Sequence, residues 1–581
     1  MNLSREMRGE GLDQGAVGRR RRPSRCGCPP ARRGRGAEKA PRAVWLLAAG
    51  VLLSLVAGLA AEGGAGGEVP EQPSGQVVKE APGQVVELAL PAAEQPGAGA
   101  REAGAEAAKP LQLSLSLREA ILTALEHNLD ISVQRFTPLI RQAEVLQALG
   151  EFDTTAFLDS AIEREKSPPS VVFVDGAPLV PASMTDSLSV DFGLRRKFST
   201  GATAELSYGD LHTVNPPSSG TQNSVLGLQV TQPLLLGAGP AVNLSDVRIA
   251  RNSRRASVYD FQQRVIDVIT QVEQAYWNLV FARGNLDVAR RALRLAEELL
   301  QSNRERVRIG VLAPAEIIRA QSSVAAQQAA ILDAESAVRD AEDSLRRLIN
   351  PPDVDLATDA EVIPTDAPHT DYAPLDLRRV IYQALTHRPD LQSRKTALEN
   401  LGISVVVARN ELLPTLDLTL FYRTKGTGRS LASTTDSLSS FLFDDYGGIV
   451  EFSVPLERRT AKGTVTAARL QLQQALVQLK NAEEGVVLEV RQQLRRVQTK
   501  YDQIDRFRRA RELAAERLQA ENDKLIHGTA TTLDVLQGQG ELASAERDEL
   551  SSAVDFNVAF VQLRRAMGTL LEDYQLQFAE P

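Results

Sequence analysis

The chain repeats one sequence pattern twice, and this duplication constrains its fold more than any other feature. Residues 115–135 (LSLREAILTALEHNLDISVQR) return in altered form at 375–395 (LDLRRVIYQALTHRPDLQSRK). Short segments with alternating apolar residues and then a very long apolar repeat follow each copy. Because such self-similarity marks repeated structural units, we expect two units of one design at 111–350 and 375–570, joined by a linker at 351–374.

The long segment of the first half carries an unbroken seven-residue apolar repeat. Its members are Val258, Val265, Val272, Leu279, Leu286, Leu293, Leu300 and Val307. This period is typical of a coiled-coil seam. A helix over residues 243–309 would be about 100 Å long, which exceeds what a compact domain can enclose. A second such helix is predicted at 461–526, so the fold is expected to be mainly α.

Each long helix is predicted to end at a glycine and to reverse direction there. Gly310 and Gly528 follow the two long segments, and glycine readily adopts the left-handed conformation that ends helices. The residues after each glycine carry seams of their own, with Ile317, Val324, Ile331, Val338 and Leu345 in one and Val535, Leu542, Phe556 and Leu563 in the other. The pattern predicts two antiparallel helical hairpins.

A small β part is predicted between the opening helix and the long helix of each half. The opening helices are expected at 116–149 and 376–411. In the second half, alternation at 415–422 and around 450–454 predicts a β-hairpin. The first half is expected to hold more strands, from alternation at 188–194, 202–208 and 226–230 and a weaker segment at 152–164.

The N-terminal region is predicted to be a signal peptide at 1–60, followed by a disordered linker at 61–110. Residues 1–60 carry 12 Lys and Arg against 4 Asp and Glu, and an apolar run ends at small residues. An uncleaved membrane anchor is the alternative. The linker has no aromatic residue, and 15 of its 50 residues are Gly or Pro. A C-terminal tail is expected at 571–581.

The composition excludes several kinds of chemistry. Removal of residues 1–60 changes the formal charge from −8 to −16, which argues against nucleic-acid binding. Cys26 and Cys28 would leave with the signal peptide, so the mature chain would have no thiol chemistry. The histidines lack ligand spacing, and no phosphate loop or nucleophile elbow is present. We expect no metal, no cofactor and no enzyme activity, and we interpret Tyr276 and Trp277 as helix packing.

With these features in place, four stretches give the chain a family resemblance: TQPLLLGAG at 231–239, EQAYWNLV at 273–280, RIGVLAPAEII at 308–318 and IHGTATTLDVL at 526–536. From residue 115 to about 570 the chain resembles the TolC-like outer-membrane efflux proteins. The resemblance implies a homotrimer in which each subunit gives four strands to a twelve-stranded transmembrane β-barrel. The helical hairpins would form a periplasmic α-barrel.

The resemblance also implies a function. Such a channel lies in the outer membrane of a Gram-negative-type cell envelope, in contact with lipid, and has a large periplasmic portion. It exports small molecules or polypeptides from the periplasm in a tripartite efflux or type I secretion system. Its partners are a periplasmic adaptor (membrane fusion protein) and an inner-membrane transporter. The alternative is a secreted coiled-coil scaffold or periplasmic adaptor without a pore, for which duplicated strands are not needed.

Site residues follow from alignment of the two tips with the family. The resemblance places an acidic periplasmic gate at Glu316 and Asp534, with Gln537 at a position that is acidic in the family. Because Thr531 and Asp534 have capping-box spacing and Glu316 lies in the first turn of a helix, stabilisation of helix N-termini is the alternative role. The residues expected to form the tip turns and to dock the adaptor are Gly310, Val311, Leu312, Gly528 and Thr529.

Overall fold

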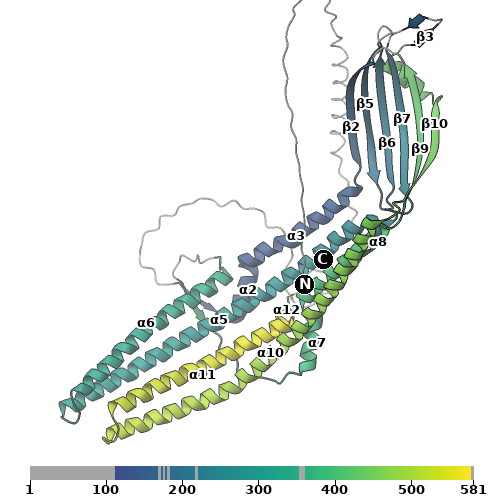
Figure 1. Ribbon diagram of the computed structural model, residues 1–581. Helices are drawn as coiled ribbons and strands as arrows, with labels where there is room; N and C mark the ends of the chain where they lie inside the picture. The colour runs from purple at the N-terminus through teal and green to yellow at the C-terminus, as the bar shows by residue number, and fades with distance from the viewer. Residues whose placement is uncertain are drawn as a thin grey trace, which may run out of the picture. The chain divides into compact units, whose positions relative to one another are not determined.

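The structure is a computed structural model, shown in Figure 1. It describes residues 111–167, 172–174, 177–179, 183–215, 220–352 and 360–576. The chain divides into a unit Met1–Ala81 and a unit Pro82–Pro581, and all the described residues belong to the second. The predicted signal peptide and the predicted linker at 61–110 therefore lie outside the described residues, as do residues 577–581 of the predicted tail.

Each repeat opens with two helices, so the prediction of single helices over 116–149 and 376–411 is wrong. The four helices are α2 (Leu117–His127), α3 (Leu129–Leu149), α7 (Leu377–His387) and α8 (Pro389–Asn410). Asn128 is extended at the first break, where its side chain accepts a hydrogen bond from the Ile131 amide at 3.1 Å. At the second break, Pro389 occupies the first helical position and restricts Arg388 to an extended conformation.

The two predicted hairpins are present, and the long helices lie within two residues of their predicted ends. The first hairpin consists of α5 (Ser245–Arg308) and α6 (Ala315–Ile349), and the second of α10 (Arg459–Ile526) and α11 (Thr532–Met567). A short helix, α4 (Pro240–Asn243), precedes α5. The seam residues Val265, Val272 and Leu279 are buried, as the heptad pattern predicts.

The core of the first repeat lies around the middle of α5. Tyr276 and Trp277 are buried and meet edge to face with ring centroids 5.4 Å apart. The Tyr276 hydroxyl lies 3.2 Å from the Leu115 carbonyl and 3.2 Å from Asp366 Oδ2. It thereby fixes the ends of β1 (Leu111–Leu115) and β8 (Ala360–Pro364), which pair in parallel. Both aromatic side chains pack in the core, as predicted.

A six-stranded antiparallel sheet forms the main β part of the described chain (Figure 1). Its order is β10-β9-β7-β6-β5-β2, and the strands are β2 (Thr155–Ser167), β5 (Ser183–Lys197), β6 (Thr203–Val214), β7 (Thr221–Pro233), β9 (Thr415–Gly428) and β10 (Asp444–Ser453). The sheet of one chain therefore has six strands, two more than the four per subunit that the resemblance implies. The two strands that exceed this number are β2 and β5, which lie in the first half, where additional strands were expected.

The remaining elements are short. They are η1 (Gly150–Phe152), β3 (Val172–Val174) paired with β4 (Ala177–Leu179), α9 (Leu431–Ser439) and α12 (Leu570–Asp573). Helix α9 follows β9 and packs on β9 and β7. None of the described helices has both the length and the hydrophobicity needed to span a membrane.

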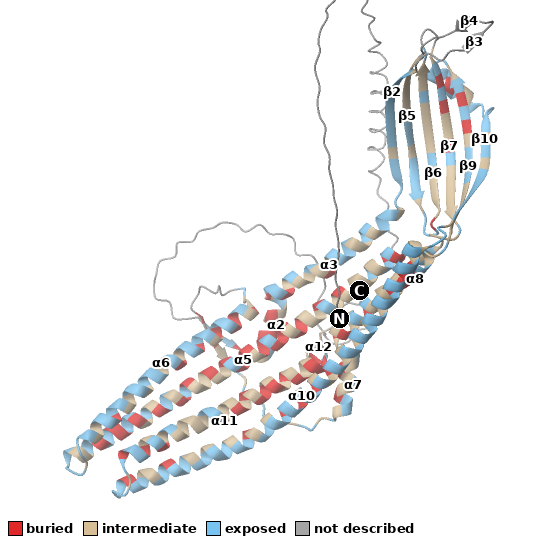
Figure 2. Cartoon of the chain, viewed as in Figure 1, coloured by how far each residue is buried: buried red, intermediate tan, exposed pale blue. Residues whose placement is uncertain are grey.

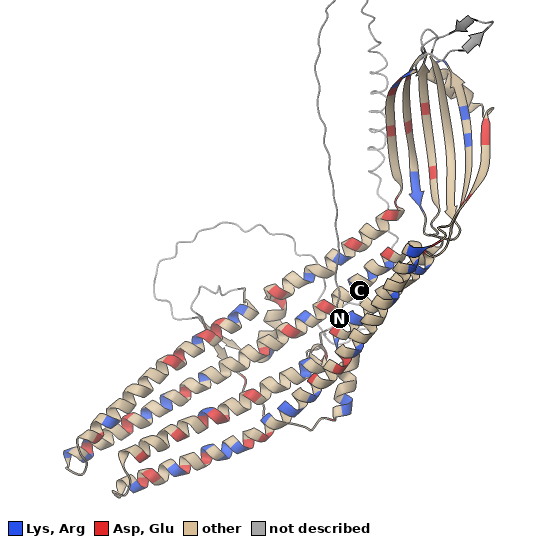
Figure 3. Cartoon of the chain, in the orientation of Figure 1, with Lys and Arg blue, Asp and Glu red and all other residues tan. Residues whose placement is uncertain are grey.

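The two faces of the sheet differ in chemistry because side chains alternate along each strand. Residues directly opposite in neighbouring strands share a face, and one such row of apolar side chains crosses all six strands: Ala156, Leu194, Leu206, Leu228, Tyr422 and Tyr446. All six are exposed. The adjacent row on the other face is mostly polar and includes Arg195, Glu205 and Gln229. Figures 2 and 3 show how little of the sheet is buried and where its charged residues lie.

Candidate functional site at the helix tips

The two helical hairpins turn in the same way. Gly310 has φ 78° and Gly528 has φ 75°, so both occupy the left-handed region that the sequence predicts. In the first tip the Val311 amide donates to the Arg306 carbonyl at 2.8 Å, and in the second the Thr529 amide donates to the Lys524 carbonyl at 2.9 Å. These bonds close a Schellman-type helix end at each tip. The long helices therefore end in the same way at the two tips.

Apolar side chains are exposed at both tips. Ile309 and Val311 in the first tip and Ile526 and Leu533 in the second each expose more than half of their surface. The predicted docking residue Thr529 is also exposed, and Leu312 is half-buried. Clustered exposed apolar side chains usually mark a surface that another molecule covers.

Asp534 lies at the start of α11 in a complete capping box. The Thr531 hydroxyl accepts from the Asp534 amide at 3.3 Å, and Asp534 Oδ2 accepts from the Thr531 amide at 2.8 Å. Hydrogen bonds from the Thr531 amide and hydroxyl hold the pKa of Asp534 below its usual value. The side chain is therefore a stable anion at the tip of the second hairpin, and its helix-capping role is confirmed.

Glu316 sits differently in the first turn of α6. Pro314 is the N-cap and gives no side-chain capping bond, and Glu316 Oε1 pairs with Arg319 Nη1 at 2.8 Å. Its other oxygen is buried and accepts no hydrogen bond within the described chain. Among the described residues, no hydrogen bond or ion pair joins Glu316 to Asp534. Gln537 donates to Glu541 Oε1 at 3.0 Å, one turn further along α11.

Contacts between the two tips were not predicted from the sequence. The buried Asn303 amide donates to the Thr532 hydroxyl at 3.2 Å, and Arg306 Nη1 donates to the Leu525 carbonyl at 2.9 Å. An apolar cluster lies beside them, formed by Leu299, Leu518, Leu525 and Val535. The end of α5 is thus fastened to the tip of the second hairpin within one chain. No sequence signal points to these contacts, because the partners lie in different repeats.

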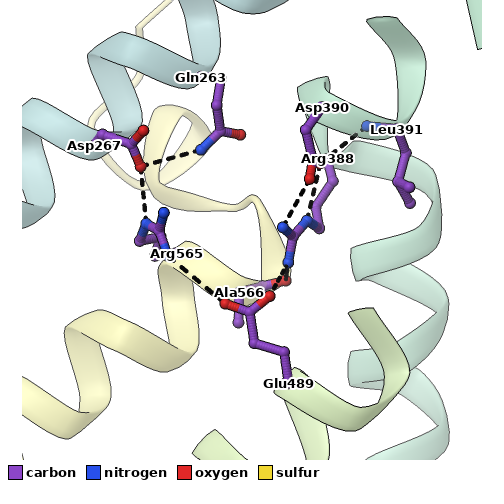
Figure 4. A network of polar contacts seen from close by, with 8 residues as sticks. All are labelled: Gln263, Asp267, Arg388, Asp390, Leu391, Glu489, Arg565 and Ala566. Carbon is purple, nitrogen blue, oxygen red and sulfur yellow. Dashed lines mark hydrogen bonds and ion pairs between the residues drawn. The ribbon is translucent and has the colours of Figure 1, made fainter. Parts of the chain in front are cut away.

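A charged network joins the two repeats far from the tips (Figure 4). Arg388, at the break between α7 and α8, donates to Asp390 at 2.9 and 3.0 Å and to Glu489 of α10. Arg565 of α11 donates to Asp267 of α5 at 2.9 Å and lies 3.6 Å from Glu489. These five charged side chains connect the C-terminal end of α11 and the middle of α10 to α5 and α8, on the side of the second hairpin that is remote from its tip.

Comparison with known proteins identifies the family. The family model described as "Outer membrane efflux protein" matches residues 199–351 and 380–569, which is more than half of the chain. The chain belongs to the outer membrane efflux protein family. One matched range falls in the later part of the first repeat and the other covers most of the second, and the gap between them contains most of the predicted linker at 351–374.

Individual outer-membrane proteins are similar to the chain in sequence or in fold. The chain is 24% identical over 321 residues to Outer membrane protein TolC of Vibrio cholerae serotype O1, covering 52% of this chain and 68% of that protein. The VceC outer membrane protein of Vibrio cholerae matches with a TM-score of 0.56 and 17% identity over 78% of this chain and 96% of its own. The open-state MtrE outer membrane channel of Neisseria gonorrhoeae matches with a TM-score of 0.55 and 19% identity, covering 78% and 88%.

Family membership settles the broad class of this protein. It is an outer-membrane efflux protein, a transporter rather than an enzyme, and its fold is mainly helical with a smaller sheet.

Proposed function

We propose that three copies of this protein form a channel in the outer membrane, with most of the helical part in the periplasm. The channel exports small molecules or polypeptides in a tripartite efflux or type I secretion system, together with a periplasmic adaptor and an inner-membrane transporter. The observation that carries the proposal is the sheet, whose apolar and polar faces are both exposed and whose two edges are open.

The sheet has the dimensions and the chemistry of a membrane-spanning surface. Its strands are 10 to 15 residues long, and a tilted strand needs about 9–11 residues to cross a bilayer. Lipid would cover the face that carries Leu194, Leu206 and Leu228, and water would fill the side that carries Arg195 and Glu205. A single sheet with both faces in water would leave this apolar row uncovered.

The helices also carry apolar surfaces that a neighbouring copy would bury. On α3, Leu129, Val133, Phe136 and Ile140 are exposed at the spacing of one helix face. On α10, a second set of exposed apolar residues comprises Leu470, Val477 and Leu488. Helix faces of this kind are typical of subunit interfaces in coiled-coil assemblies. They support a trimer whose helices form a continuous tube.

The helix tips are the proposed entrance. A threefold axis would turn Glu316 and Asp534 into two rings of three carboxylates, and converging negative charges favour cations. The exposed apolar residues Ile309, Val311 and Ile526 would meet the hairpins of the adaptor. The contacts of Asn303 and Arg306 with the second tip would hold the entrance closed until that hairpin moves.

Isolation of the outer-membrane fraction, a native mass in mild detergent and a planar-bilayer recording test this proposal. We expect a trimer that conducts ions. The double variant Glu316→Gln with Asp534→Asn should lower the ratio of cation to anion permeability. The control Glu298→Gln with Asp548→Asn removes the same charge from exposed positions on the shafts of α5 and α11 and should leave that ratio unchanged.

The outcomes separate the parts of the proposal. A soluble monomer or dimer would contradict the channel itself. A conducting trimer with unchanged selectivity in the double variant would retain the channel and remove the acidic entrance.

A further inference from the structure

Two strands of the sheet lie outside the part of the chain that matches the family. The family match begins at residue 199, whereas β2 and β5 end at Ser167 and Lys197. Both are nevertheless full members of the sheet, since β2 pairs with β5 over 13 residues and β5 pairs with β6 over 12. The described chain therefore presents a six-stranded sheet whose open edges are β2 and β10.

The directions of the two edge strands allow copies of the chain to join edge to edge. Every neighbouring pair in the sheet is antiparallel, so the directions alternate from β10 to β2. With an even number of strands, the two edges point in opposite directions. The edge β2 of one copy would therefore lie antiparallel to β10 of the next, and the ladder would continue without a change of type.

The two edges are also staggered as a closed sheet requires. The pairings lead from Thr155 at the start of β2 straight across the six strands to Gly447 of β10. Strand β10 continues past Gly447 to Ser453, so it extends six residues further toward the helices than the start of β2 does. Barrel closure needs tilted strands and such a stagger of the register.

We propose that β2 of each copy pairs with β10 of the neighbouring copy, with Thr155 opposite Ser453, and that three copies thereby close an eighteen-stranded barrel. The inference rests on the trimer proposed above. In this register all ten residues of β10 pair with residues of β2. The same register also keeps the polar and apolar faces continuous across the junction, because a shift by a single residue would exchange them.

Side chains at this junction match. On the apolar face, Leu158 lies opposite Val450 and Ile162 lies opposite Tyr446, and all four are exposed in the single chain. At the far end, Arg164 lies opposite Asp444, which adds a negative charge beside a guanidinium that already pairs with Asp186 at 2.6 Å. Apolar and oppositely charged cross-strand pairs both stabilise a sheet.

A barrel of eighteen strands would be wide, so the narrowest part of the channel would not lie in the outer membrane. Barrel diameter grows roughly in proportion to strand number, so eighteen strands give a bore about half again as wide as twelve. Barrels of about 16–18 strands leave an open aqueous channel. The outer-membrane part would then admit bulky cargo, and discrimination would fall to the helix tips.

Disulfide trapping tests the junction. In a background with Cys26→Ser and Cys28→Ser, the pair Leu158→Cys with Val450→Cys should give covalent dimers and trimers on oxidation in the outer membrane. The pair Ile162→Cys with Tyr446→Cys should do the same. Leu158→Cys alone should give neither, because the two edges of the interface differ. All four positions are exposed, so the substitutions leave the core intact.

A competing pair separates this arrangement from a twelve-stranded one. Leu206→Cys on β6 with Val450→Cys would cross-link if β10 of one copy met β6 of the next, and that result without the Leu158 and Val450 product would overturn the proposal. A native trimer in which neither β2 pair cross-links would also overturn it while leaving the channel standing. A monomer in the native-mass measurement would remove both the junction and the proposed function.

Discussion

The two repeats of this protein share one plan but not one environment. When Gly310 is aligned with Gly528, the C-cap residues of the return helices α6 and α11, Asn350 and Gly568, fall at the same position. Both have a left-handed backbone, with φ 43° and 75°. The breaks before the strands also correspond, at Asn128 and Arg388. Duplication has thus preserved the backbone turns, which depend on local sequence.

The long helices differ in what surrounds them. Helix α5 packs against α3, α6, α8 and α11 and buries 23 of its 64 residues, whereas α10 packs against α7, α8 and α11 and buries nine of its 68. Helix α5 is therefore the central helix of the chain, and α10 keeps one side free. Within one chain, the second hairpin is therefore the less firmly held of the two.

One pair of aligned positions shows the difference most clearly. On the first long helix the position is Glu273, which is buried, and on the second it is Arg491, which is exposed. Glu273 accepts from Arg564 Nη2 at 2.7 Å and from the Tyr574 hydroxyl at 3.0 Å. Burial raises the pKa of Glu273, although Arg564 and Tyr574 oppose the shift. This ion pair joins the central helix to the end of α11.

The largest expected effect comes from breaking that ion pair. Glu273→Ala leaves Arg564 with Asp573, 3.7 Å away, as its carboxylate partner and opens a gap in the core. Removing one partner of a buried pair costs about 3–5 kcal/mol, and because Arg564 is partly exposed we expect about 3 kcal/mol. Urea unfolding followed by circular dichroism measures the change in the free energy of unfolding. Glu298→Ala, an exposed change on the same helix, should cost much less, and equal losses would contradict the central role of Glu273.

The second effect tests how the second hairpin is held. Arg388→Met keeps the length of the side chain but removes the bonds to Asp390 and Glu489 (Figure 4). Glu489 is partly exposed and retains Arg565, so we expect a loss of about 2 kcal/mol in the free energy of unfolding. Arg379→Met replaces an exposed arginine of α7 and serves as the control. A loss confined to α5 and α6 in hydrogen exchange would show that the network does not hold the second hairpin.

The third effect tests the equivalence of the tips. Gly310→Ala and Gly528→Ala each force an alanine into a left-handed conformation, at a cost of about 1–2 kcal/mol. No atom lies within 4 Å of the added Cβ at either site, so the cost is that of the backbone alone. Hydrogen exchange of the last helical turns should therefore change equally in the two variants. A much larger change in hydrogen exchange at one tip would show that the two helix ends are held by different contacts.

The sequence predicts the helical part well because its signals are local. Heptads fix which face of α5 and α10 is buried, and a glycine fixes where each helix ends. The break at Arg388 was also accessible, since Pro389 restricts the residue before it. The break at Asn128 carries a weaker signal, because an asparagine that caps a helix also occurs within one.

The contacts between distant residues were not predictable in this way. Asn303 and Thr532 are 229 positions apart, and neither belongs to a pattern that names its partner. The number of strands in the sheet could not be predicted from the sequence for a different reason. Alternation at 188–194 and 152–164 was visible, but only the paired backbone shows that β2 and β5 continue the sheet.

The weakest of the predicted changes distinguishes Asp534 from Glu316, the two acids of the proposed entrance. Asp534 has a pKa below its ordinary 3.8 because Thr531 donates to its carboxylate. Its contribution to the capping box is therefore complete above about pH 4 and is lost as the pH falls through the lowered pKa of the folded state. Glu316 makes only an ion pair with a largely exposed Arg319, and such pairs contribute about 0–1 kcal/mol.

Hydrogen exchange of the first turn of α11 measures the difference. Between about pH 7 and pH 5 the protection of that turn should stay constant, and below about pH 4 it should fall in the wild type. Asp534→Asn should show the lower protection already at neutral pH and little further change in acid, because the amide cannot titrate. Glu316→Gln should leave the first turn of α6 almost unchanged. If acid weakened α11 equally in the Asp534→Asn variant, a group other than Asp534 would control the stability of the tip, and the capping box would not distinguish Asp534 from Glu316.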